Sequence, residues 1–155
     1  MIDALYSTQI LRLAANLPRS GRLVAPHGTG EQVAKLCGSR ALVDVRLDDS
    51  GRVVDFAQDI KACALGQAAA GVVGQSVIGT GEAELAATRD AMLAMLKSGA
   101  AGPEGRFLDL RQLAQVADYP ARHASTLVGL EATLKAVRAA LNRDAETVGD
   151  RVDVA

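Results

Sequence analysis

The two cysteines of this chain are the residues best suited to a chemical role. Cys37 lies within the segment KLCGS, and Cys63 lies within the segment KACALG. A cysteine thiolate binds metal ions and accepts sulfur, whereas a free cysteine that only packs behaves as a small buried hydrophobe. Both stand close to a glycine at the expected end of an element, which favours reactive thiols, although the packing interpretation stays open.

The two histidines differ in the roles that their surroundings indicate. His27, in the segment APHG, is typical of an exposed loop residue. His123, in the segment RHAST, begins the last expected helix, where it is either a solvated first-turn residue or a metal ligand. Because the chain contains no Cys-x-x-Cys motif, a metal site would have to be assembled from separated elements.

Hydrophobic periodicity predicts the elements that position these residues. Apolar residues at helical spacing predict a helix over 6–17, and the segment 18–30 is expected to be a loop. Between residues 32 and 62 the period changes to two, and turn residues at 49–51 separate two of the runs. We therefore expect three antiparallel strands, with Cys37 near the end of one strand and Cys63 where the third strand gives way to a helix.

The remainder of the chain has the pattern of helices. An alanine- and glycine-rich segment follows Cys63, a second helix is expected from a cap at Thr80 to Gly99, and a short helix covers 108–116. The last helix, over 126–141, has the clearest apolar stripe. The predicted fold class is α+β, a three-stranded antiparallel sheet with helices packed on one face. We expect a single domain over 1–143 and a polar, frayed tail over 144–155.

Composition and charge limit the classes of function. The chain has 155 residues, 49% of them hydrophobic, which suits one compact domain with a real core. Seventeen basic and eighteen acidic residues leave a net charge of −1, which argues against a nucleic-acid partner. The absence of a leader pattern and of a long apolar run predicts a soluble, cytoplasmic protein with no membrane partner.

The order of these segments resembles the IscU/NifU family of iron-sulfur cluster assembly scaffold proteins, from about residue 5 to residue 141. In that family one cysteine lies in a Cys-Gly-Asp loop, a second in Gly-Cys-Ala before a helix, and a third where the last helix begins. Cys37 and Cys63 match the first two positions. The segment RHASTL resembles the third, with His123 just before the ligand position and Ala124 upon it. The long stretch between Cys63 and Ala124 is similar to the SufU subgroup.

The chain departs from the family pattern at two ligand positions. Ser39 stands where the family has an aspartate, and Ala124 stands where it has the third cysteine. The resemblance therefore implies an incomplete set of candidate ligands for a metal ion or cluster, namely Cys37, Cys63 and His123. These residue types suit both iron and zinc, with a fourth ligand from solvent or from a partner protein.

Three functions remain open from the sequence. The first is a scaffold or sulfur acceptor that works with a cysteine desulfurase, holds an iron-sulfur cluster transiently and serves apo iron-sulfur acceptor proteins. The second is a zinc-binding protein of SufU-like fold, and the third is a degenerate interaction module without a cluster. In each case the chain supplies ligands or a surface, so we do not expect an enzyme.

Overall fold

A computed structural model describes the backbone of residues 6–154 and the side chains of residues 6–143. Its sheet contains β1 (Gly28–Ala34), β2 (Ser39–Leu47) and β3 (Val53–Lys61), paired antiparallel in the order β1-β2-β3. The predicted α+β fold with three antiparallel strands is therefore confirmed. The first strand starts earlier than expected, because Gly28, Thr29 and Gly30 pair with β2 in a segment that the sequence assigned to a loop.

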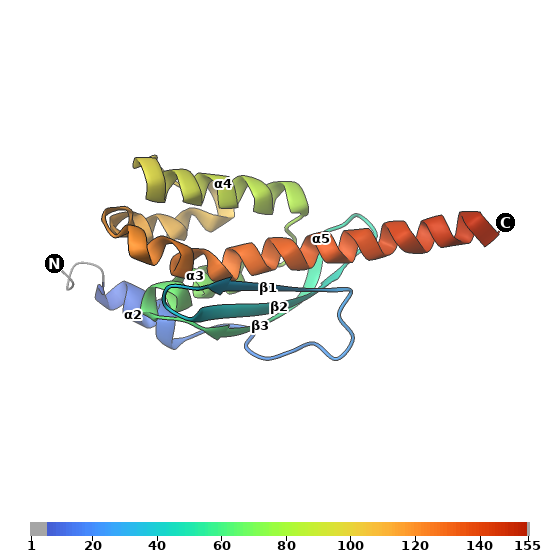
Figure 1. Cartoon of the computed structure of the whole chain (residues 1–155), viewed down its shortest axis with the longest axis horizontal. Coiled ribbons are helices and arrows are strands. Elements are labelled where there is room, and N and C mark those ends of the chain that lie inside the picture. The colour runs from blue at the N-terminus through green and yellow to red at the C-terminus, as the bar shows by residue number, and fades with distance from the viewer. Residues whose placement is uncertain (1–5, 155) are drawn as a thin grey trace.

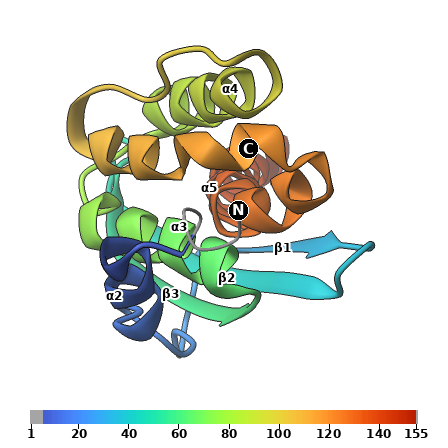
Figure 2. The same ribbon diagram turned by 90° about the vertical axis from the view of Figure 1, so that its left-hand side faces the viewer.

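The helices gather over one face of the sheet, as predicted, and they form two layers (Figures 1 and 2). The layer on the sheet consists of α3 and α5, and α2 packs against α3. The outer layer consists of α4 and η1, on the far side of α5 from the sheet. The bounds are α2 (Thr8–Ala15), α3 (Ala64–Ser76), α4 (Glu82–Ser98), the 3-10 helices η1 (Gly105–Asp118) and η2 (Pro120–Arg122), and α5 (His123–Val154).

Glycines in β1 allow α5 to lie unusually close to the sheet. A Cβ atom at Gly28 would overlap the carbonyl oxygen of Ala136, and one at Gly30 would overlap the carbonyl oxygen of Ala132. Glycine weakens a strand by itself, but here its missing side chain is what the packing requires. This close approach fixes the position of α5 across the sheet.

Small residues also bring α3 and α5 together. An added Cβ at Gly66 would lie 2.7 Å from the carbonyl oxygen of Ser125, and one at Gly129 would lie 3.1 Å from the Cβ of Ala70. The alanine-rich sequence after Cys63 thus forms a helix packed closely against another backbone, as predicted. Its consequence is that the first turn of α5 lies beside the first turn of α3.

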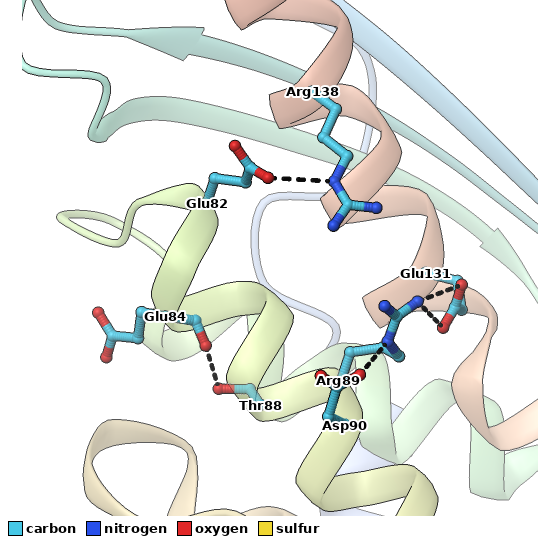
Figure 3. Close-up of polar contacts among 7 residues, drawn as sticks. All are labelled: Glu82, Glu84, Thr88, Arg89, Asp90, Glu131 and Arg138. Atoms are coloured by element: carbon cyan, nitrogen blue, oxygen red, sulfur yellow. Dashed lines mark hydrogen bonds and ion pairs between the residues drawn. The ribbon is translucent and has the colours of Figure 1, made fainter.

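Two ion pairs join the outer helix α4 to α5 (Figure 3). Arg89 on α4 pairs with Glu131 at 3.2 Å, and Arg138 on α5 pairs with Glu82 at 3.3 Å.

The helix α4 ends at the predicted place. Its C-cap residue is Gly99, whose φ of 73° is the left-handed conformation that ends a helix. It begins one residue later than expected, because Gly81 is the N-cap and the hydroxyl of Thr80 donates to the carbonyl of Val77 instead.

The segment before β1 contacts β2 at Asp44, on the face of the sheet opposite the helices. Asp44 is fully buried and accepts hydrogen bonds from the guanidinium of Arg22, the backbone N–H of Leu23 and the hydroxyl of Thr29. Burial alone would raise the pKa of Asp44, but these hydrogen bonds outweigh it and lower that pKa. The segment is thus fastened to β2 by a paired charge.

The last helix continues past the region expected to end the domain. In Figure 1 α5 runs along the sheet and projects beyond it, and its backbone remains helical to Val154. The domain boundary at residue 143 stays a prediction. Among the described residues, no helix is both long and apolar enough to cross a membrane.

Candidate functional site

Cys37 lies in the short turn that joins β1 to β2. Its neighbour Gly38 has a φ of 73°, a left-handed conformation that favours glycine and lets the chain reverse within four residues. The backbone N–H of Gly38 donates to the carbonyl of Ala34 and closes the turn. Cys37 is exposed as a result, so its sulfur is accessible to a partner.

Cys63 is the N-cap residue of α3, immediately after β3. Its carbonyl accepts the backbone N–H of Gln67, which forms the first turn of the helix. The predicted position at a strand-to-helix junction is therefore confirmed. In contrast to Cys37, Cys63 is half-buried.

A continuous chain of hydrogen bonds connects the two thiols. The thiol of Cys37 donates to the hydroxyl of Ser39 at 3.2 Å, and that hydroxyl donates to the hydroxyl of Ser125 at 3.3 Å. The hydroxyl of Ser125 lies 3.1 Å from the sulfur of Cys63, and either atom can donate. Both serines are buried, with exposed fractions of 3% and 1%. The sequence analysis did not identify Ser125, because its contacts join three elements that are distant in the chain.

Ser39 changes the electrostatics of the exposed thiol. Its hydroxyl, followed by its backbone N–H, lowers the pKa of Cys37 below the ordinary value of a cysteine. Once Cys37 has lost its proton, the hydroxyl and the backbone N–H of Ser39 can donate to its sulfur, and such hydrogen bonds stabilise the thiolate, which is the nucleophile and the metal ligand. Cys37 is therefore both accessible and activated.

The two thiols also share a pocket of about 250 Å³. It is lined by Leu36, Cys37, Cys63, Ala121, Arg122 and Ser125. Leu36 is 86% exposed at its rim. A second hollow is lined by both cysteines together with Ser39, Lys61 and Gln67, among others. Both cysteines therefore line each of the two hollows, which a small group can enter.

The two histidines lie apart from this hydrogen-bond chain. The Nε2 atom of His123 is 2.9 Å from the carbonyl oxygen of Val116 and 3.3 Å from that of Ala117, both in η1. The Nδ1 atom of His27 accepts the backbone N–H of Leu47 at 2.9 Å. The structure therefore brings Cys37 and Cys63 together, and it directs the Nε2 atom of His123 to the end of η1.

Comparison with known proteins places this arrangement in a family. Residues 5–126 match the family model described as the NifU-like N-terminal domain. The chain belongs to this family. A crystal structure of a nitrogen-fixing NifU-like protein (N-terminal) from Brucella abortus is 45% identical, with a TM-score of 0.87, over 91% of this chain and 97% of that one. Membership of the NifU-like family supports a role in iron-sulfur cluster assembly.

A more distant similarity concerns the fold alone. A protein from Fervidobacterium islandicum AW-1, described as an iron-sulfur cluster assembly scaffold for the SUF system, is 21% identical with a TM-score of 0.77. The match covers 86% of this chain and 96% of that one. A search of curated protein sequences gave no significant match.

For a NifU-like domain, the ligand set of this chain is small. Within the part of the chain that the structure describes, no three His, Cys, Asp or Glu side chains gather closely enough to hold one metal ion. The thiols of Cys37 and Cys63 line one pocket and are the two sulfur ligands that the chain offers there. A ligand role for His123 stays a prediction, and through Nε2 it would require this atom to leave the carbonyl oxygens of η1.

Ser125, rather than Ala124, is the residue of α5 that lies against the thiols. Ala124 is exposed, whereas Ser125 is buried between Ser39 and Cys63. Successive residues of a helix point about 100° apart, so a shift of one position changes which side chain enters the site. Matching short motifs by sequence therefore selected the neighbour of the residue that contacts Cys63.

Proposed function

We propose that this NifU-like domain accepts sulfur on Cys37 from a cysteine desulfurase and uses it in the assembly of iron-sulfur clusters. The observation that supports this most directly is the exposed thiol whose pKa Ser39 lowers, at the entrance of a pocket that it shares with a second thiol. An accessible thiolate is the group that attacks a persulfide.

The cluster itself is cargo in this proposal. Cys37 and Cys63 would provide two thiolates, and a cluster normally requires about four protein ligands. His123 would supply a third ligand if its ring turned toward the sulfurs. The remainder would come from a partner, which suits a scaffold that releases its cluster to apo iron-sulfur proteins. Such a site should hold a cluster only briefly.

The test is sulfur transfer in an anaerobic mixture of the full chain, a cysteine desulfurase and free cysteine. We expect the intact mass of the wild-type chain to increase by whole sulfur atoms and to return on treatment with a reductant. The Cys37→Ser variant should gain no sulfur, whereas Ser98→Ala, which changes an exposed hydroxyl on α4, should behave as wild type. Equal loading of Cys37→Ser and wild type would refute Cys37 as the acceptor.

Metal analysis of the freshly isolated protein separates this function from the zinc interpretation. A full equivalent of zinc that blocks alkylation of both thiols would favour a zinc protein. Two thiols that alkylate readily would agree with a sulfur acceptor.

A further inference from the structure

We propose that sulfur accepted by Cys37 is then passed within the chain to Cys63, and that Ser125 and Ser39 are positioning residues that conduct a proton in the opposite direction. This inference rests on the proposed function, because it begins from a persulfide on Cys37. It adds a second sulfur position and a role for two buried serines.

The unequal exposure of the thiols gives the transfer its direction. Cys37 is exposed on a turn, whereas Cys63 is half-buried at the N-terminus of α3. A sulfur donor therefore reaches Cys37 more easily than Cys63. Both residues line the same pocket, so a sulfur on Cys37 and the thiol of Cys63 face a common space.

The transfer is balanced without an added oxidant or reductant. The sulfur of Cys63 attacks the outer sulfur of the Cys37 persulfide, a new S–S bond forms on Cys63, and the old S–S bond breaks with its electron pair left on Cys37. Cys63 loses a proton as it attacks, and Cys37 gains one as it leaves. The products are a Cys63 persulfide and a free Cys37 thiol.

The two serines suit this proton movement. A hydroxyl both donates and accepts, so the chain from Cys63 through Ser125 and Ser39 to Cys37 can carry a proton by reversing the direction of each hydrogen bond. The links of 3.1, 3.3 and 3.2 Å leave no gap in the chain.

Burial strengthens the assignment of Ser125 in particular. Its side chain lies in the first turn of α5 and is held beside Cys63 by the close packing of Gly66 against the Ser125 backbone. A buried hydroxyl needs a partner, and here the partners are Ser39 and the sulfur of Cys63. The fold therefore holds this hydroxyl where a proton must pass.

Passing sulfur inward frees Cys37 to accept another. The wild-type chain should therefore carry up to two sulfurs, one on each thiol. Each Cys→Ser variant should carry fewer than wild type.

The experiment uses the full chain, anaerobic and metal-free, mixed with glutathione persulfide as a defined donor. Samples are quenched at intervals with iodoacetamide, digested and analysed by mass spectrometry for sulfur on the Cys37 and Cys63 peptides. In wild type we expect sulfur to appear first on Cys37 and later on Cys63. In Ser125→Ala the ratio of Cys63-borne to Cys37-borne sulfur should fall by about a hundredfold at early times, the lower end of the range for loss of a positioned proton-transfer group.

Three further variants serve as a second test of the hydrogen-bond chain, as a control and as a test of the sulfur source. Ser39→Ala breaks the chain at its other end and should lower the same ratio, which covers the case in which Ser125→Ala folds poorly. Ser98→Ala, a hydroxyl bonded only within α4, should match wild type. Cys37→Ser should leave Cys63 nearly unlabelled, because Cys63 receives its sulfur from Cys37.

The outcomes separate this inference from the proposed function. If Cys37 takes up sulfur and Cys63 stays empty, the inner transfer is refuted while Cys37 remains an acceptor. If Cys63 is labelled as fast in Cys37→Ser as in wild type, it loads directly and the inference also fails. If neither thiol takes up sulfur, the proposed function and the inference both fail. A normal ratio in folded Ser125→Ala and Ser39→Ala would remove the serines from the mechanism.

Discussion

Two polar clusters in this domain, one buried and one open to solvent at one end, use hydrogen bonds for different purposes. In the carboxylate cluster, Asp44 accepts hydrogen bonds from Arg22, Leu23 and Thr29, and its charge is paired. In the thiol cluster, defined as Cys37, Ser39, Ser125 and Cys63, every member can donate and accept, and one end opens to solvent.

The difference separates a structural network from a reactive one. A carboxylate that accepts several fixed donors has one preferred arrangement, which is useful for fastening a loop to a strand. A row of hydroxyls and thiols can reverse its hydrogen bonds at little cost, which is useful for moving a proton. We therefore expect changes in the carboxylate cluster to affect stability and changes in the thiol cluster to affect sulfur chemistry.

The largest effect is expected at Asp44. Replacing it by alanine removes the acceptor of the Thr29 hydroxyl, the Leu23 N–H and the Arg22 guanidinium, and should lower the free energy of unfolding by about 2–3 kcal/mol. The loss stays below that of a fully buried ion pair because Arg22 is half-exposed and can turn to water. Chemical denaturation measures it. Glu31→Ala, which breaks an exposed pair with Arg40, should cost less than about 1 kcal/mol. If Asp44→Ala and Glu31→Ala lower the free energy of unfolding equally, burial does not make the Asp44–Arg22 pair more stabilising than the Glu31–Arg40 pair.

The pH dependence of this contribution has a definite sign. The pKa of Asp44 is lowered in the folded chain, so its contribution is complete above the ordinary aspartate value of about 4 and is lost as the pH falls below it. The difference in stability between wild type and Asp44→Asn should therefore be largest near neutral pH and shrink in acid. Denaturant titrations at several pH values measure it, and a difference that grows in acid would contradict the assignment.

Gly66→Ala tests whether the thiol cluster depends on the packing of α3 against α5. The added Cβ would lie 2.7 Å from the carbonyl oxygen of Ser125, so the helices must separate, at a cost of about 1–3 kcal/mol. The same shift should move Ser125 away from Cys63 and lower the share of sulfur on Cys63. Gly129→Ala lies in the same contact between α3 and α5, and its added Cβ would lie 3.1 Å from the nearest atom. It should therefore lower the free energy of unfolding less than Gly66→Ala does. A stable Gly66→Ala variant with a normal distribution of sulfur between the two cysteines would show that α3 and α5 can move apart without disturbing the thiol cluster.

A third thiol should stabilise a bound cluster more at position 125 than at position 124. Ser125 lies against Cys63 whereas Ala124 is exposed. Ser125→Cys should therefore slow the decay of cluster absorbance, after reconstitution with iron and sulfide and with a chelator present, by about tenfold, because the cluster gains a thiolate. Ala124→Cys should decay nearly as fast as wild type. The opposite order would show that the site opens when the cluster binds.

The smallest effect is expected from Ser39→Ala on the reactivity of Cys37. Loss of the hydroxyl should raise the pKa of the thiol and reduce its alkylation rate at pH 7 by about threefold, because less thiolate is present. The backbone N–H of residue 39 remains, which limits the change. The pH profile of iodoacetamide alkylation should shift toward higher pH, and Ser20→Ala, an exposed hydroxyl in the segment before β1, serves as the control. An unchanged profile would assign the activation of Cys37 to the backbone alone.

Local patterns were sufficient to predict the elements and the places of the two cysteines. The alternation over 41–47 and the stripe over 127–141 report which face of a strand or helix is buried, and both are visible in the sequence because they depend on near neighbours. The same reasoning missed the first residues of β1, since Gly28 and Gly30 have little strand propensity and are favoured there by the close approach of α5.

By itself, the sequence determined the α+β fold with three antiparallel strands, the family, and two thiols at the ends of elements. The tertiary structure alone decided that Asp44 is covered and paired, and that Ser125 rather than Ala124 lies between the thiols. The physical reason is separation along the chain. Ser125 meets Cys63 across 62 residues and Ser39 across 86, and contacts between such distant residues depend on how whole helices pack on the sheet, which no local pattern records.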